Sequence, residues 1–126
     1  MFYLGKRSNL RLQGVHADLV RVVSIALTYS TIDFTVLDGV RTEERQLKLF
    51  QAGATTTLNS RHLTGHAVDL GAWVDGEVRW DWPLYTQIAN AMKLAALEED
   101  VLIEWGGDWK TFKDGPHFQL PWKAYP

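Results

Sequence analysis

The fold prediction starts from residues 60–69, which read Ser60-Arg61-His62-Leu63-Thr64-Gly65-His66-Ala67-Val68-Asp69. Its first half is typical of a turn and its second half of a strand, in which successive side chains point to opposite faces of a sheet. His62 and Asp69 are seven positions apart, so a straight strand would place them on opposite faces. We therefore expect a bend at Thr64-Gly65, because glycine adopts backbone angles that other residues avoid.

Strand parity separates the two histidines of this stretch. From residue 66 onward, Ala67, Asp69 and Gly71 share one face, while His66 points to the other. His62 precedes the bend and is free to return towards Asp69, so His62 rather than His66 is the predicted partner of that carboxylate. The small residues at positions 67 and 71 are expected to leave room for a metal ion and a substrate.

A third histidine lies near the C-terminus, in the sequence Asp114-Gly115-Pro116-His117-Phe118. Two imidazoles and one carboxylate, with a fourth position open for water, form the ligand set of many hydrolytic zinc sites. His62, Asp69 and His117 are therefore the predicted ligands, and Asp114 can approach the water without ligating the metal. Spacing alone leaves a structural alternative open, because isolated histidines are usually surface or hydrogen-bonded core residues and such aspartates are often turn formers.

Periodicity predicts helices and strands on both sides of this stretch. Apolar residues that recur every three to four positions predict helices, and β-branched or aromatic runs predict strands. Asp75-Gly76 suits a hairpin turn. The expected order is a helix over 9–28, a strand over 32–37, a helix from Thr42 to Gly53, a loop over 54–59, a strand over 66–72, a helix over 83–99, a strand over 101–105 and a short strand over 117–120. This order predicts an α+β domain with a small, mostly antiparallel sheet and packed helices.

Length and composition narrow the class of protein. A chain of 126 residues is long enough for one domain with a core and too short for a catalytic domain plus a binding module. A formal net charge of -2, without a basic cluster interleaved with aromatics, argues against a nucleic-acid partner. Without cysteine, a metal must be held by histidine and carboxylates. No apolar run approaches the roughly 20 residues of a membrane span, so membrane insertion is not expected.

At these residues the chain resembles the zinc D,D-peptidases and L-alanyl-D-glutamate peptidases of peptidoglycan. The family pattern S-x-H-x-x-G-x-A-x-D is matched at every fixed position of 60–69, and the later acidic-x-x-His motif is matched by Asp114 and His117. Segment 39–42 is similar to the family's Gly-Tyr-Arg step, with Val40 in place of the aromatic residue, and segment 104–109 is similar to its Trp-Gly-Gly-x-Trp element. The resemblance implies a hedgehog/DD-peptidase-like fold.

The resemblance also implies roles at the metal. His62, Asp69 and His117 would bind one Zn²⁺ ion, and Asp114 would take the proton of the attacking water and return it to the leaving amine. Aspartate rather than glutamate at position 114, the short chain and Gly-Val-His at 14–16 are most similar to the phage endolysin branch.

Four further residues are candidates around the metal. Arg41 would stabilise the oxyanion, the alternative being a surface cation beside the glutamates at positions 43 and 44. Ser60 would either bind substrate or shape the turn before His62. Trp105 and Trp109 flank the glycine pair 106–107 and are expected to border the cleft, whereas the other four tryptophans are expected to be structural.

The function that the resemblance implies is a zinc endopeptidase that cleaves the L-Ala-D-Glu bond of the peptidoglycan stem peptide and acts as a phage endolysin in host cell lysis. The alternative is a D-alanyl-D-alanine carboxypeptidase or dipeptidase, which uses the same metal chemistry. A second alternative is a non-catalytic, metal-containing binding domain, as in the similar hedgehog signalling domain. The presence of Asp114 argues against this second alternative, since a structural metal site needs no base.

A role in lysis implies a location and a partner. The N-terminus has no apolar signal region, so the protein is expected as a monomer in the host cytoplasm until a holin-type permeabilising protein lets it reach peptidoglycan. Residues 1–126 are expected to form a single catalytic peptidase domain without a separate cell-wall-binding domain. That organisation is more usual where the peptidoglycan layer is thin, which favours a Gram-negative host.

Overall fold

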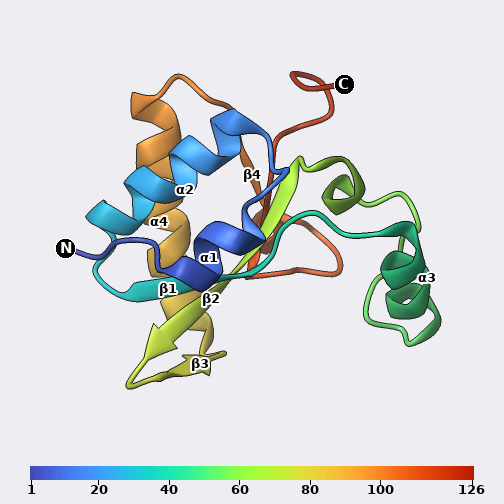
Figure 1. Ribbon diagram of the computed structural model, residues 1–126, viewed down its shortest axis with the longest axis horizontal. Helices are drawn as coiled ribbons and strands as arrows, with labels where there is room; N and C mark the ends of the chain where they lie inside the picture. The colour runs from blue at the N-terminus through green and yellow to red at the C-terminus, as the bar shows by residue number, and fades with distance from the viewer.

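The computed structural model describes residues 1–126 and contains a five-stranded antiparallel sheet flanked by helices (Figure 1). The strands are β1 (Asp33–Asp38), β2 (Ala67–Val74), β3 (Glu77–Arg79), β4 (Glu104–Trp105) and β5 (His117–Gln119). Four of them follow the order β1-β2-β5-β4, and β3 pairs with the C-terminal half of β2. β2 is therefore the central strand, and the predicted α+β class with a mostly antiparallel sheet is confirmed.

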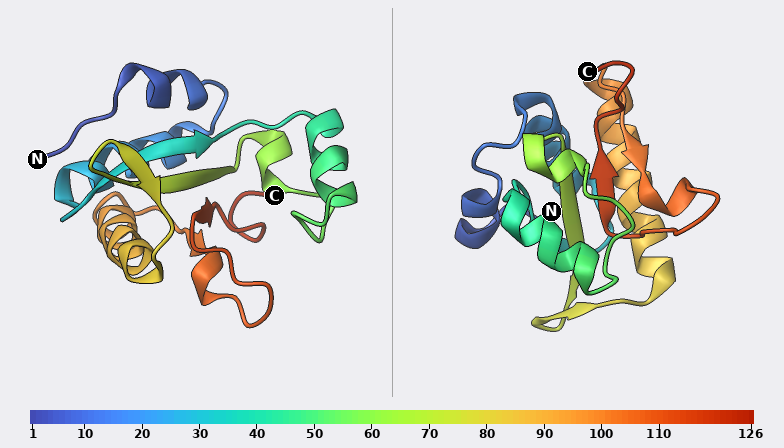
Figure 2. Two further views of the ribbon diagram at one scale, coloured as in Figure 1. Left: turned by 90° about the horizontal axis from the view of Figure 1, so that it is seen from below. Right: turned by 90° about the vertical axis from the view of Figure 1, so that its right-hand side faces the viewer.

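Four α-helices and two 3₁₀ turns surround the sheet. They are α1 (Lys6–Arg11), α2 (Ala17–Tyr29), α3 (Glu43–Gln51), η1 (Arg61–Thr64), α4 (Trp82–Glu98) and η2 (Gly106–Asp108). α1 and α4 lie on opposite sides of the sheet, as both views in Figure 2 show. α3 stands apart from this body, at the end of the molecule opposite β3 (Figure 1).

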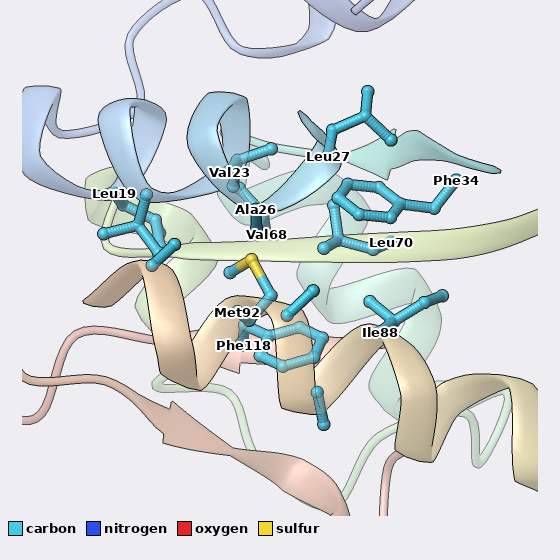
Figure 3. Packing of buried hydrophobic residues seen from close by; sticks show 14 of the residues in the cluster. Leu19, Val23, Ala26, Leu27, Phe34, Val68, Leu70, Ile88, Met92 and Phe118 are labelled. Carbon is cyan, nitrogen blue, oxygen red and sulfur yellow. The ribbon is translucent and has the colours of Figure 1, made fainter. Parts of the chain in front are cut away.

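The core forms where α2, α4 and the sheet meet (Figure 3). Val68 and Leu70 of β2 are fully buried there, beneath α2 and above Met92 of α4. Because side chains alternate along a strand, burial of these two residues fixes the register of β2 and turns Asp69 to the other face. The hydrophobic core thus determines where the central carboxylate of the candidate site points.

The predicted single helix over 9–28 is wrong, because the chain forms α1 and α2 with a turn between them. Gly14 adopts φ +84° in this turn, and His16 begins α2 by accepting a hydrogen bond on Nδ1 from the backbone N–H of Asp18. The backbone N–H of His16 also donates to the carbonyl of Gly65 at 2.8 Å. The turn therefore supports the loop that follows η1, which a continuous helix could not do.

Two further expectations about β-structure are corrected. The strand expected over 101–105 is limited to Glu104–Trp105, because only these residues pair with β5. The space expected beside Gly71 is filled, since a Cβ there would lie 2.9 Å from the side chain of Leu37, and Ala67 is fully buried. The predicted Asp75-Gly76 turn is confirmed, with φ of +53° and +78° as a tight hairpin requires.

Candidate metal centre and cleft

His62 is positioned by the short turn η1. The hydroxyl of Ser60 accepts a hydrogen bond from the backbone N–H of His62 at 3.1 Å, which caps the start of the turn. Gly65 ends the turn with φ +77°, the left-handed conformation that glycine tolerates best. The predicted bend at Thr64-Gly65 is therefore present, and Ser60 shapes the turn.

Three side chains with metal-ligating atoms meet beside this turn. Asp69 of β2 and His117 of β5 are direct register partners, and His62 returns to them from η1. Nε2 of His62 and Nδ1 of His117 each lie 3.3 Å from Oδ1 of Asp69, and all three ligand atoms lie within 4.8 Å of one another. His66 lies outside the group, with Nδ1 2.7 Å from the hydroxyl of Thr64. The structure thus brings together the three predicted ligands and separates His66 from them.

Outer hydrogen bonds determine which nitrogen of each imidazole faces Asp69. Nδ1 of His62 lies 2.8 Å from the carbonyl oxygen of Gly39, which can only accept, so this nitrogen carries the proton and Nε2 is left for a metal. Nε2 of His117 donates to Oε1 of Gln119 at 2.8 Å, which leaves Nδ1 for a metal. Two imidazoles oriented in this way, together with one carboxylate, fit a zinc ion.

The electrostatics of this cluster favour a bound cation. Burial alone would raise the pKa of Asp69, but hydrogen bonds from His117 and His62 outweigh burial and lower that pKa well below its usual range. Burial alone would lower the pKa of His117, but the hydrogen bond and charge of Asp69 outweigh burial and raise it. The carboxylate therefore remains ionised and is stabilised by positive charge on the two imidazoles. A divalent cation can supply this positive charge in place of the protons.

Asp114 is held beside the cluster by the glycine break. Its backbone N–H donates to the carbonyl of Gly106 at 3.0 Å, and a Cβ at position 106 would clash with the carbonyl of Asp114. Burial first, and then the charge of Asp69, raise the pKa of Asp114, whose side chain lines the cleft. A carboxyl group with a raised pKa at the edge of a metal cluster is suited to transfer protons.

Trp105 lies beneath this loop and does not line the cleft, although the sequence analysis places it at the border. Its Nε1 donates to the carbonyl of Gly115 at 2.7 Å, and its ring occupies the space that a Cβ at Gly107 would need. Trp105 therefore supports the segment that carries Asp114. Trp109 does line the cleft, with its ring centroid 5.1 Å from that of His117.

Arg41 is tied into the site by side chains that the sequence analysis missed. Its Nη2 donates to Asp38 at 2.9 Å and to Asp69 at 3.3 Å, and its Nη1 donates to Gln46 at 2.7 Å. The side chain is only 9% exposed, so the surface alternative beside positions 43 and 44 is wrong. Gln46 is buried and donates to the carbonyl of Thr57 at 2.7 Å, yet its spacing in α3 does not distinguish it from an exposed glutamine.

The cluster opens into a cleft of about 600 Å³. Figure 2 shows α3 and the chain after it on one side of the ends of β2 and β5, and the segment 106–116 on the other. Three aromatic side chains line the cleft in addition to Trp109, and none of them was expected there: Trp80, Phe112 and Trp122. Trp80 and Trp122 were expected to be structural, but they are 64% and 47% exposed. No pattern in the sequence separates an exposed tryptophan from a buried one.

The sequence pattern of the phage L-alanyl-D-glutamate peptidase family matches residues 1–120. The chain therefore belongs to the phage L-alanyl-D-glutamate peptidase family. A solved structure, the L-Ala D-Glu endopeptidase ChiX of Serratia marcescens, is similar with a TM-score of 0.94 and 52% sequence identity, covering 99% of this chain and 94% of that one. No helix combines the length and the apolar character that crossing a membrane would require.

Three further proteins are similar to this chain in sequence. The L-alanyl-D-glutamate peptidase of Escherichia phage T5 is 29% identical over 117 residues, which cover 90% of this chain and 85% of the relative. The L-alanyl-D-glutamate peptidase of Listeria phage A118 is 35% identical over 94 residues, and the peptidoglycan L-alanyl-D-glutamate endopeptidase CwlK of Bacillus subtilis (strain 168) is 31% identical over 103 residues. These matches cover 75% and 71% of this chain, but only 32% of the Listeria phage protein and 61% of CwlK.

Proposed function

We propose that this protein is a zinc-dependent endopeptidase that cleaves the L-Ala-D-Glu bond of peptidoglycan stem peptides. The observation that carries the proposal is the cluster of His62, Asp69 and His117 at the cleft, with the carboxyl group of Asp114 beside it. The activity named for the relatives in phages T5 and A118, in Bacillus subtilis and in Serratia marcescens supports the choice of bond.

The side chains divide the chemical work. Zinc, when bound, would supply the Lewis acid that activates water and polarises the scissile carbonyl. Asp114 would take the proton of the attacking water and return it to the leaving amine, because its raised pKa suits both directions of transfer. Arg41 would hold Asp69 in place and stabilise negative charge on the carbonyl oxygen. Trp109, which lies against His117, would contact the substrate.

Two other functions would use the same cluster. A D-alanyl-D-alanine carboxypeptidase or dipeptidase would release free D-alanine, and a non-catalytic metal domain would release nothing. Asp114 favours catalysis over the second of these, since a structural metal site does not need a proton acceptor. The products therefore distinguish the three functions directly.

Digestion of purified sacculi tests the proposal. The protein is expected to create new N-terminal D-glutamate, identified by mass spectrometry of the released peptides. A chelator should abolish the release and added zinc should restore it, with one zinc ion per chain by elemental analysis. Free D-alanine in place of N-terminal D-glutamate would transfer the assignment to the carboxypeptidase, and absence of any product would favour the binding domain.

A pair of aspartate variants tests the proton transfer. Asp114→Asn should retain zinc and lower kcat by about 100-fold or more, which is the range of general acid-base catalysis. Asp108→Asn is the matched control. Asp108 is exposed, its carboxylate lies 2.8 Å from Nζ of Lys93, and it does not line the cleft. Normal turnover by Asp114→Asn would refute Asp114 as the proton acceptor.

We also propose a setting for this activity. The protein would act as one catalytic domain and as a monomer, made in the cytoplasm of a Gram-negative host and released to peptidoglycan by a holin-type permeabilising protein during phage lysis. Expression in such a host tests the dependence: turbidity should fall only when a holin is expressed with the protein. Lysis by the protein alone would refute the need for a holin.

A further inference from the structure

The cleft has two chemically different walls. α3 and the chain after it contribute a mainly polar wall, in which Arg45, Thr55, Thr56, Thr57 and Asn59 accompany the apolar residues Leu49 and Ala54. Three of the four aromatic residues at the cleft form the aromatic wall, which consists of Trp80, Trp109 and Phe112, whereas the fourth, Trp122, lies against the guanidinium of Arg61. Trp109 and Phe112 belong to the segment that faces α3 across the ends of β2 and β5 (Figure 2). The cluster of His62, Asp69 and His117 therefore lies between a surface rich in hydroxyl and guanidinium groups and a surface of aromatic rings.

Two rings of the aromatic wall, those of Trp80 and Trp109, have aromatic partners that hold them. Trp80 is 64% exposed, and its ring stacks on the buried ring of Tyr85 with 8° between the planes. Cβ of Tyr85 lies 3.4 Å from the position that a Cβ at Gly115 would take, so Tyr85 packs against the segment 106–116. Because Trp80 stacks on Tyr85, Trp80 lies on the same side of the cleft as this segment. Trp109 is supported by the ring of His117. Rings that are oriented in this way present a preformed apolar surface to a ligand.

Phe112 carries the strongest sign of a functional contact. It is 58% exposed and adopts φ +51°, a left-handed conformation that is unfavourable for a bulky residue and favourable for glycine. An exposed phenylalanine in this conformation contributes little to the core, so folding alone does not explain it. Strained residues of this kind cluster at ligand-binding sites.

The proposed substrate has the same two-sided chemistry. The amino group of L-alanine is joined through a lactyl group to an N-acetylated amino sugar, so the sugar lies one residue from the scissile amide. On the other side of that amide, D-glutamate and the residues after it carry free carboxylates. A pyranose ring has a face of C–H groups that packs on aromatic rings, and carboxylates pair with guanidinium and hydroxyl groups.

We propose that the aromatic wall binds the sugar attached to L-alanine, while the polar wall, with Arg45, binds the carboxylate-bearing side of the stem peptide. This inference rests on the proposed function and adds the direction in which the substrate lies in the cleft. It makes the protein a selective enzyme for stem peptides that are still attached to glycan.

Two matched substrates test the inference. One is a disaccharide muropeptide, and the other is the same peptide with an acetyl group on L-alanine in place of the sugar. The wild-type kcat/KM should be about tenfold higher for the muropeptide, which is the factor expected from one well-packed aromatic contact. Phe112→Gly and Trp80→Ala should each bring the ratio of the two kcat/KM values towards one, chiefly by raising KM for the muropeptide.

The controls separate recognition of the sugar from other effects. Arg45→Ala should lower kcat/KM for both substrates by a similar factor and leave their ratio unchanged, because both substrates carry the carboxylates. Phe112→Gly should unfold at the same or a higher temperature than the wild type, since glycine relieves the strained backbone. A wild-type ratio of one, or a ratio that neither aromatic variant changes, would overturn the inference while the proposed function stands. Cleavage of neither substrate would overturn both.

Discussion

Nε2 of His117 donates a hydrogen bond to Oε1 of Gln119 at 2.8 Å, two positions along the same strand. The orientation of the Gln119 amide is fixed by Glu104, because only the amide nitrogen can donate to a carboxylate, and it does so at 3.3 Å. The relay from β4 to β5 therefore selects the tautomer of His117 in which Nδ1 is free. The third candidate ligand is prepared for a metal by residues that do not touch the metal.

Replacement of Gln119 by leucine should weaken zinc binding without unfolding the protein. Loss of an outer hydrogen bond to a metal-ligating histidine typically lowers metal affinity by about 10- to 100-fold. Competition with a coloured chelator measures the zinc affinity. Glu104→Gln is the milder control, since it keeps the amide of Gln119 in place through a neutral acceptor. Equal zinc affinity for Gln119→Leu and the wild type would contradict the role of the relay.

Gly106→Ala should lower activity by displacing Asp114. The added Cβ would clash with the carbonyl of Asp114 and lie 3.0 Å from its Cβ, so the carboxyl group must move. A displacement of about 1 Å at a reacting group can reduce turnover by roughly 100-fold. Gly5→Ala is the matched control, because nothing lies within 4 Å of a Cβ there. Steady-state kinetics on sacculi measure the effect, and equal kcat values for the two variants would argue against positioning by Gly106.

Gln46→Leu should reduce both stability and activity. The substitution removes the acceptor of Arg41 Nη1 and the donor to the carbonyl of Thr57, and leaves buried polar groups without partners. The expected loss of unfolding free energy is about 1–3 kcal/mol. Urea unfolding measures it, with Gln51→Leu on the exposed end of the same helix as the control. A variant as stable as Gln51→Leu would show that this hydrogen-bond chain contributes nothing.

The metal-free protein should lose stability as the pH rises from 6.5, the unfolded-state pKa of histidine, through the raised folded-state pKa of His117. Burial alone would lower the pKa of His117, but Asp69 raises it above the unfolded value of 6.5. A raised folded-state pKa means that the contribution of His117 is complete below the unfolded pKa and disappears as the pH rises through the folded one. Urea unfolding in chelator at several pH values measures the decline. His117→Gln should have a weaker decline than the wild type, and identical slopes would contradict this coupling.

The meeting of His62 and Asp69 was predictable because these two parts of the candidate metal site obey local rules. Alternation along β2 separates His66 from Asp69, and a glycine marks the bend that returns His62. His117 and Asp114 were proposed from their residue types and supported by the family motif, because no local rule predicts that β5 pairs with β2 at Asp69.

Other features depend on tertiary contacts that have no local signal. The turn that separates α1 from α2 forms because residues 14–16 pack against Gly65, far along the chain. Apolar periodicity alone favours a continuous helix there. Trp105 ends β4 and Trp80 directly follows β3, yet Trp105 is buried beneath the loop of Asp114 while Trp80 lines the cleft. Their positions are decided by packing partners rather than by their own sequence neighbourhoods.

The pairing of Asp69 with His117 also determines when the candidate site can be completed during translation. The two residues are 48 positions apart, and β3, α4 and β4 lie between them in the chain. A ribosome-bound chain that ends before β5 presents an imidazole and a carboxylate without the second imidazole. The metal binding that we propose would therefore be a late event, which follows translation of almost every other element, and an incomplete chain would lack one of the three candidate ligands.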